Sequence, residues 1–334
     1  MTLLLAGTAA GAADCLPDVS VPITVRIGEG PPVAALLEGG IETPLSLFDA
    51  VSGRLLWSAA AHSSAVQVFS GMDAAFTGSL AAIDLDADGV HDRIYAGDMS
   101  ARLWRFDLQH AAAATEWAIG GVFADFSNTQ GRSFLAAPDI SLSAPPGMSA
   151  WLNIAIGTAA PGNPVANNRF YALRDHALEP WDAGQYEEWQ PWREDDLERV
   201  SATVQAIDDA ASIMDAGSPG WYAELGSGHV IVPSLTVNHR AVLVIASAVP
   251  QIGGPCEIFA RIATFDLGQQ SIVPASSTGE WQVPLPRPVS AATNFSISAV
   301  QEGTATCTLG GQWVPACDVD TRPRKTWWRR ADAE

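Results

Sequence analysis

The stretch most informative about the fold is Leu47-Phe48-Asp49-Ala50-Val51-Ser52-Gly53-Arg54-Leu55-Leu56-Trp57. Apolar residues flank an Asp-x-x-x-Gly segment, which is the composition of two short strands joined by a tight turn. An aromatic or Leu-containing run that ends near an Asp recurs at 104–108, 171–175 and 264–267. Repeated hairpins of this kind are typical of stacked propeller blades, although the repeat here is degenerate.

Short β-rich runs separated by Gly, Pro, Asn and Asp continue along the 334-residue chain. The predicted strands cover 23–27, 45–48, 65–69, 93–96, 151–157, 170–173, 230–237, 241–249 and 258–267. The composition is 48% hydrophobic, which allows a sizeable core, and its 29 Gly and 22 Pro suit a turn-rich architecture. We therefore expect an all-β fold over 1–334, most consistent with a modified β-propeller.

One segment departs from the β pattern. Its apolar residues fall at spacings of three and four, at Leu197, Val200, Val204, Ile207, Ala211 and Met214. This spacing predicts an amphipathic helix around 195–215, which Asp195 or Asp196 would cap and Gly217 would end. Together with the Trp-rich run before it, the helix forms a predicted insertion at 180–217. Core packing is the expected use of these Trp residues, and a platform for a ligand or partner is the alternative.

The chain has 37 acidic and 18 basic side chains and a net charge of -19. Such a surface repels phosphate backbones and attracts divalent cations, so we expect no nucleic-acid partner. No stretch reaches the ~20 apolar residues of a membrane span. The segment 1–13 lacks the basic start of a signal peptide and is interpreted as a buried strand, so an export signal is expected outside this chain.

Four cysteines, Cys15, Cys256, Cys307 and Cys317, fit two disulfides in an oxidising compartment. Cys307 and Cys317 flank a Gly-Gly turn, so a bridge across a hairpin is the expected local pairing. Cys15 and Cys256 would then pair only by default. No Cys-x-x-Cys occurs, which argues against a structural zinc site.

The strongest chemical signal is the loop Asp84-Leu85-Asp86-Ala87-Asp88-Gly89-Val90-His91-Asp92. Carboxylates alternate along it, and calcium prefers about six to eight hard oxygen ligands supplied in this way. Gly89 permits the left-handed backbone that turns the loop. The predicted Ca²⁺ ligands are the carboxylates of Asp84, Asp86, Asp88 and Asp92 and the backbone carbonyl of Val90.

A helical calcium hand would need a Glu three residues after Asp92, where the chain has Tyr95 in a predicted strand. The loop is therefore expected to lead into a β-strand, with Asp92 closing the ligand set. Asp98, six residues on, is interpreted as a turn residue, and orienting the loop is the alternative role. A solvated acidic turn without metal is the alternative. Four carboxylates this close would repel one another unless a cation joined them.

Catalytic motifs are missing from the sequence. None of the six histidines has the spacing of a zinc protease motif, and there is no Gly-x-Ser-x-Gly elbow, P-loop or Gly-x-Gly-x-x-Gly. We therefore expect no enzymatic activity.

The calcium loop and its continuation through 93–99 and 103–108 resemble the C-terminal region of the PilC/PilY pilus-tip proteins. Further similar stretches follow in family order, at 134–141, 151–157, 168–175, 220–225 and 326–330. The resemblance extends over nearly the whole chain. Taken together, these stretches are specific for the family. Taken one at a time, only the calcium loop is specific.

This resemblance implies a modified β-propeller that is exported and placed at the pilus tip or cell surface. It implies roles in type IV pilus assembly, in the balance of extension and retraction, and in adhesion. The implied partners are minor pilins and host or surface ligands, and the implied cofactor is Ca²⁺ at residues 84–92. Family members have a long region before the propeller, so the resemblance also implies a propeller truncated at its N-terminus.

Two other propeller classes share parts of the pattern. The Asp-Ala-x-x-Gly string that starts at Asp49 is similar to repeats of quinoprotein dehydrogenases, but those enzymes typically have an adjacent Cys pair, and this chain has none. Integrin-type propellers carry Asp-x-Asp-x-Asp-Gly loops, usually several per chain, and only one occurs here. Alcohol oxidation with added quinone would favour the first class, and three or more calcium sites the second.

Overall fold

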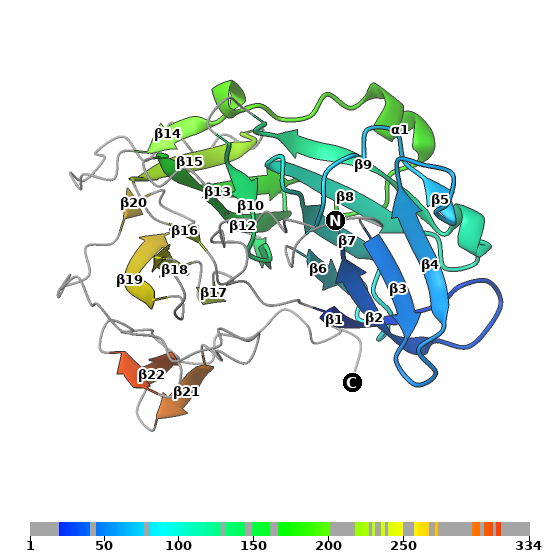
Figure 1. The fold of residues 1–334 in the computed structure, drawn as a ribbon, viewed down its shortest axis with the longest axis horizontal. Coiled ribbons are helices and arrows are strands. Elements are labelled where there is room, and N and C mark those ends of the chain that lie inside the picture. Colours follow the sequence, from blue (N-terminus) through cyan, green and yellow to red (C-terminus); the bar gives the residue numbers. More distant parts are fainter. Residues whose placement is uncertain are drawn as a thin grey trace, which may run out of the picture.

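The fold is seen in a computed structural model (Figure 1). It describes residues 20–40, 45–76, 80–127, 131–143, 149–160, 166–200, 218–226, 229–230, 235–237, 240–249, 257–266, 271–272, 296–300, 304–309 and 312–314. After Glu224 only the backbone of the strands is described.

Five β-sheets follow one another along the chain. The first contains β1 (Ser20–Val25), β2 (Val33–Gly39), β3 (Leu45–Asp49), β4 (Leu55–Ala60) and β5 (Gln67–Val68). The second contains β6 (Leu80–Ile83), β7 (Arg93–Gly97), β8 (Arg102–Leu108) and β9 (Ala118–Asp125). The third contains β10 (Ser133–Phe134), β11 (Asp139–Ser143), β12 (Trp151–Ala159), β13 (Asn168–Asp175), β14 (Glu198–Val200) and β15 (Gly220–Gly226).

For the two remaining sheets, the structure describes the backbone of the strands. One contains β16 (His229–Val230), β17 (Leu235–Val237), β18 (Arg240–Val249), β19 (Glu257–Asp266) and β20 (Ser271–Ile272). The other contains β21 (Ser296–Val300), β22 (Thr304–Leu309) and β23 (Gln312–Val314). The helices of the described residues are short: η2 (Ala114–Glu116), α1 (Ala183–Glu188) and η3 (Glu194–Asp196). None of these helices is long and apolar enough to cross a membrane.

The predicted hairpin at 47–57 is confirmed as β3 and β4, with Leu47 opposite Trp57. The carboxylate of Asp49 accepts hydrogen bonds from the backbone N–H groups of Val51 and Ser52, at 3.0 and 2.7 Å. Gly53 then adopts a φ of 69°, which a side chain would resist. The Asp-x-x-x-Gly sequence is thus explained by the turn that it forms.

The sheets are arranged as propeller blades are. The first four sheets contact one another in chain order through their early strands, since β1 contacts β6, β6 contacts β11, and β11 contacts β17. The sheets fan out from this region, with β4 and β9 farther from it than β1 and β6 (Figure 1). The expectation of an all-β fold is confirmed, and the arrangement agrees with the propeller prediction.

The far edges of the first three sheets are all covered by a short parallel segment. β5 runs parallel to β4, and β14 runs parallel to β15. Beside β9, Ala124 forms a parallel bridge with Trp192. Exposed strand edges invite pairing with other chains, so these segments protect the edges from aggregation.

The second sheet is buried on both faces. Ile94 and Trp104 belong to a core shared with the first sheet. Tyr95 and Leu103, their neighbours in sequence, belong to a core shared with the third sheet. Successive strand residues point to opposite faces, so both sets of side chains in β7 and β8 are largely buried.

The helix predicted around 195–215 is wrong where the structure describes it. Residues 194–196 form one turn of 3₁₀-helix, and Glu198–Val200 form β14, which pairs with β15 opposite Trp221. Pairing with an exposed strand edge overrides the helical spacing of Leu197 and Val200. The rest of that prediction, from 201 to 217, lies outside the described residues.

Two other predictions fall largely outside the described residues. One is the strand in segment 1–13. The other is the disulfide pairing, because only Cys307 among the cysteines lies in a described strand. The backbone agrees with the hairpin on which that pairing was based, since β22 and β23 pair with Leu309 opposite Gln312.

Candidate metal centre

The acidic loop connects β6 to β7. Ile83 and Arg93 pair across the base of this hairpin, and the backbone N–H of Asp92 donates to the carbonyl of Ile83 at 2.8 Å. Within the loop, Gly89 has a φ of 89° and Ala87 a φ of 61°. The left-handed turn predicted at Gly89 is present. Ala87 adopts the same left-handed conformation, which is sterically unfavourable for a residue with a Cβ and is kept only where the surrounding loop imposes it.

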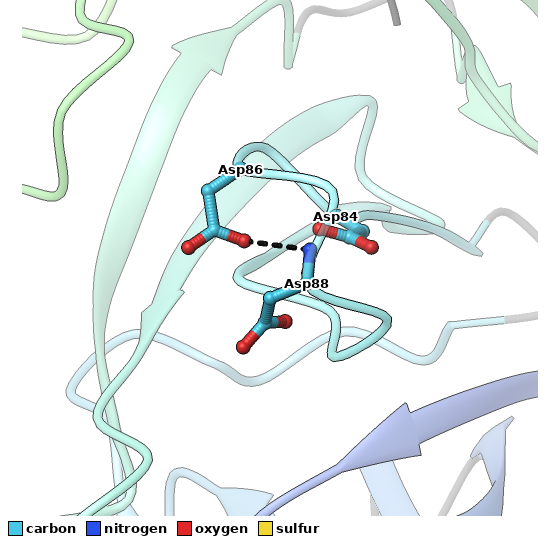
Figure 2. Close-up of side chains that lie close together, drawn as sticks. All are labelled: Asp84, Asp86 and Asp88. Carbon is cyan, nitrogen blue, oxygen red and sulfur yellow. Dashed lines mark hydrogen bonds between the residues drawn. The ribbon is translucent and has the colours of Figure 1, made fainter. Parts of the chain in front are cut away.

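Three of the predicted ligands lie together. Asp84, Asp86 and Asp88 each offer one carboxylate oxygen, and these oxygens lie within 4.8 Å of one another. Figure 2 shows the three side chains on one turn of the loop, with the N–H of Asp88 donating to Asp86 Oδ1 at 3.0 Å. Asp86 and Asp88 are exposed, and Asp84 is half-buried.

Backbone hydrogen bonds hold this group in place. Gly89 N–H donates to Asp84 Oδ2 at 2.9 Å, and Val90 N–H donates to Asp88 Oδ1 at 2.7 Å. Each carboxylate therefore uses one oxygen on the loop backbone. None of the ion pairs found among the described residues includes Asp84, Asp86 or Asp88. Their negative charges have no basic partner within that part of the chain.

The other oxygen of Asp84, Oδ1, is buried and has no hydrogen-bond partner. A buried carboxylate oxygen without a partner costs free energy, which a cation bound to it would recover. Three hard carboxylate oxygens within reach of one ion supply part of the about six to eight oxygen ligands that Ca²⁺ prefers. The residues present therefore fit a calcium ion.

Asp92 lies outside this group of three. Its Oδ2 accepts from Leu85 N–H at 2.6 Å, and its Oδ1 lies 3.0 Å from His110 Nε2. Burial by itself would raise the pKa of Asp92, but the hydrogen bonds from His110 and Leu85 outweigh burial and hold the pKa below its usual value. In the structure Asp92 thus fastens the base of the loop.

Val90, the predicted source of a carbonyl ligand, has a side chain that is 2% exposed. Its neighbour His91 ties the loop to β1: His91 N–H donates to the carbonyl of Thr24 at 2.9 Å, and Thr24 N–H donates to His91 Nδ1 at 3.1 Å. The chain directly after Val90 is therefore held against β1 by two hydrogen bonds.

The turn predicted at Asp98 is confirmed and is more extensive than expected. Asp98 is fully buried, and its Oδ1 accepts from the N–H groups of Ser100 and Arg102. Its Oδ2 accepts from the Arg102 side chain and from Trp104 Nε1. This carboxylate orients the β7–β8 turn and takes no part in the acidic loop.

Directly after the loop begins a buried charge cluster that the sequence analysis missed. Arg93 Nε donates to Asp107 at 2.6 Å, and Arg105 pairs with Asp107 at 2.8 Å and with Asp175 at 3.0 Å. The Tyr95 hydroxyl donates to Asp175 at 2.5 Å. The four charged side chains are at most 1% exposed. Two cations and two anions therefore balance one another without water.

Arg93 also holds the segment that covers this cluster. Its guanidinium donates to the carbonyls of Ala177 at 2.7 Å and Glu179 at 3.0 Å. Burial alone would lower the pKa of Arg93, but the Tyr95 oxygen and the Asp107 and Asp175 carboxylates raise it above its usual value. The guanidinium stays charged, so the second sheet is firmly joined to the third.

The predicted insertion supplies the cover. The ring of Trp181 stacks on Arg105, whose guanidinium carbon lies 4.1 Å from the ring centroid. The backbone N–H of Trp181 and the Tyr186 hydroxyl both donate to Asp107 Oδ2, at 3.1 and 2.8 Å. The expected packing role of this segment is confirmed for Trp181.

One sequence signal could have revealed the cluster. Arg93 and Tyr95, like Arg105 and Asp107, are two residues apart within a strand, so both members of a pair lie on one face. Opposite charges on one face of strands that are otherwise apolar indicate a buried ion network rather than a solvated surface.

Comparisons with known proteins bear mainly on the fold. No protein-family model matches this chain, and no curated protein matches it. Among solved structures, it is similar to the C-terminal domain of PilY1 from Pseudomonas aeruginosa, with a TM-score of 0.56 and 16% identity. The match covers 90% of this chain and 73% of that one. This likeness supports a PilY1-like propeller fold.

Two quinohemoprotein alcohol dehydrogenases are more distant. The ADHIIG enzyme of Pseudomonas putida HK5 has a TM-score of 0.40 at 10% identity, over 87% of this chain and 40% of that chain. The enzyme of Comamonas testosteroni has a TM-score of 0.37 at 12% identity, over 92% and 43%.

Proposed function

We propose that this chain is a calcium-binding, pilus-associated propeller that acts in type IV pilus assembly, in the extension–retraction balance and in adhesion. The observation that carries the proposal is the Asp84, Asp86 and Asp88 group, with the partnerless Asp84 Oδ1 beside it. The fold likeness to the PilY1 C-terminal domain supports the pilus assignment. The partners would be minor pilins and surface ligands, and the protein would act outside the cell.

Each loop residue has a proposed role in holding Ca²⁺. Asp84, Asp86 and Asp88 would supply carboxylate oxygens, and Val90 its backbone carbonyl. Both oxygens of Asp92 already have hydrogen-bond partners, Leu85 and His110. Asp92 would therefore bind the ion if one of these hydrogen bonds gave way to it, and with both intact it would hold the loop closed. The ion would neutralise the mutual repulsion of the three carboxylates.

We further propose that the protein is a binding and assembly factor and not an enzyme. The buried Arg93 and Asp107 cluster is paired internally and covered by Trp181, which suits a structural role. The quinoprotein alternative has no support from a site in the described residues, and its test remains alcohol oxidation with added quinone and calcium.

Isothermal titration with Ca²⁺ tests the proposed site on the full 334-residue chain. We expect one equivalent to bind, and Asp86→Ala to weaken binding by about 100-fold or more. The matched control is Asp195→Ala, which removes an exposed carboxylate elsewhere and should leave binding unchanged. Equal affinity in Asp86→Ala would refute the site, and three or more equivalents would favour an integrin-type propeller.

A genetic test addresses the pilus role. Deleting the gene should reduce surface piliation and twitching, and the wild-type gene should restore both. Complementation with Asp86→Ala should restore protein level but not the calcium dependence of piliation. Normal piliation in the deletion strain would contradict the role while leaving the metal site intact.

A further inference from the structure

Besides the acidic loop, the described residues contain a small cavity with aromatic walls. It has a volume of about 310 Å³ and is lined by Phe123, Trp181, Trp189 and Trp192, with the chain from 174 to 177 beside them. The three Trp side chains are only half-buried. A volume near the lower end of the range for small-molecule sites suits a compact ligand group.

The rings that line the cavity pack against one another at different angles. Trp189 and Trp192 are perpendicular with centroids 5.1 Å apart, and Trp189 lies 4.9 Å from Trp181 at 50°. Phe123 stacks on Trp189 at 5.6 Å. Trp189 Nε1 is fixed by the carbonyl of Phe123 at 3.1 Å. The walls are thus held in place before any ligand arrives, which lowers the entropic cost of binding.

The segment that carries the walls is acidic. Between His176 and Trp192 it has four acidic residues and no Lys or Arg. Glu187 and Glu188 directly precede Trp189, and both are exposed. Neither belongs to an ion pair among the described residues. These exposed carboxylates therefore favour the approach of a cation to this segment.

The charged residues that line the cavity are Arg174 and Asp175. Asp175 is neutralised by Arg93 and Arg105. Arg174 is next to Asp175 in β13, so its side chain leaves the opposite face of the sheet. Its guanidinium carbon lies 5.0 Å from the ring centroid of Trp151, which is not one of the walls.

We propose that this cavity binds an organic cation, either a quaternary ammonium group or the cationic end of a polypeptide side chain. Aromatic faces attract such cations strongly once the cations have lost water. Trp181 already stacks on the guanidinium of Arg105 within the protein, 4.1 Å from ring centroid to carbon. The exposed Glu187 and Glu188 would attract the cation from solution.

Choline and its neutral isostere dimethylbutanol, in which carbon replaces nitrogen, separate charge from shape. We expect choline to quench or shift tryptophan fluorescence of the full chain, and the isostere to bind at least about ten-fold more weakly. Peptides with trimethyl-lysine or Arg identify the source: tighter binding than choline assigns a polypeptide, and weaker binding a free ammonium compound. Equal binding of the isostere, or no binding of any cation, would overturn the proposal.

Variants of the walls and rim locate the binding. Trp192→Ala should weaken choline binding about ten-fold, and Trp192→Phe should keep most of it. Glu187→Gln with Glu188→Gln should weaken it by several-fold at low salt and less at high salt. Glu29→Gln, in the exposed β1–β2 turn, removes a charge elsewhere and is the control. Equal melting temperatures would show that the variants fold. Unchanged binding in a folded Trp192→Ala would reject the cavity as the site.

Discussion

Two groups of aspartates, one before and one after Asp92 in the sequence, bring carboxylates close together but differ in the positive charge near them. In the loop, Asp84, Asp86 and Asp88 converge within 4.8 Å without a basic partner among the described residues. In the buried cluster, Asp107 and Asp175 meet two arginines at distances of 2.6 to 3.4 Å. Converging carboxylates require a counter-charge, which the protein supplies in the second group and which our proposal draws from solvent in the first.

This difference has a consequence for how each group depends on conditions. The stabilising effect of the loop should depend on free Ca²⁺, because an ion that binds only the folded state stabilises it by mass action. The buried cluster should be indifferent to Ca²⁺ and to salt, because water and ions do not reach it. The following four variants test this contrast.

The largest effect should come from Arg93→Met. It removes one cation from the buried cluster and leaves Asp107 and Asp175 with a single arginine. Breaking a dry ion network in this way costs about 3–5 kcal/mol of unfolding free energy. Urea unfolding measures it, with exposed Arg54→Met as control, expected within about 0.5 kcal/mol of wild type. A loss of unfolding free energy below about 1 kcal/mol would show that water reaches the cluster or that the cluster rearranges.

The second effect concerns the calcium supply. At a free Ca²⁺ concentration about 100 times its dissociation constant, wild type should gain about 2.7 kcal/mol over a chelated sample. Asp84→Asn should lose most of this gain, because it neutralises the carboxylate whose Oδ1 is buried without a partner. Thermal unfolding with and without chelator measures it. Tyr95→Phe, in the buried cluster, should keep the full gain in unfolding free energy on adding Ca²⁺. A reduced gain in this variant would mean that the buried cluster also depends on Ca²⁺.

The third effect is smaller and depends on pH. Burial raises the pKa of Tyr95 well above its usual value of 10.0, and the nearby Asp175 carboxylate raises it further. The folded state therefore holds this proton more tightly than the unfolded chain. Its contribution is complete below about pH 10 and declines above it, by about 1.4 kcal/mol per pH unit.

Tyr95→Phe isolates this term. The variant should lose about 1–2 kcal/mol at neutral pH, because the hydrogen bond to Asp175 is gone. It should also show a shallower loss of stability than wild type above about pH 10. Denaturant unfolding across the alkaline range measures both. Identical slopes for the two proteins would mean that Tyr95 ionises in the folded state as it does in the unfolded one.

How far the sequence predicts each group follows from the separation of its members. The loop aspartates lie within five residues, so their spacing and Gly89 already indicate a turn with converging oxygens. Arg93 and Asp175 are 82 residues apart, and only the packing of two sheets brings them together. Strand alternation places Arg93 and Tyr95 on one face but cannot identify their partner.

The failed helix has a similar cause. Spacings of three and four after Asp195 satisfy a helix locally, but Glu198–Val200 lie beside an open edge of β15. A strand edge next to a short segment offers backbone hydrogen bonds that no local pattern reveals. The edge itself depends on the order of the strands, which the sequence did not specify.

The smallest effect should come from Asp49, which ends β3 as Asp175 ends β13 but is only half-buried. Backbone N–H donors of Ser52 and Val51 lower the pKa of its carboxylate. Its stabilising contribution is therefore complete above its usual pKa of 3.8 and is lost as the pH falls through the lower folded value. Unfolding of Asp49→Ala should thus differ from wild type at neutral pH and converge with it in acid. Asp49→Asn keeps an acceptor without the charge, so it should lie between the two. If Asp49→Ala lost as much unfolding free energy as Arg93→Met, a carboxylate in a surface turn would contribute as much as one in the buried cluster. The contrast between aspartates neutralised within the protein and aspartates that meet solvent would then fail.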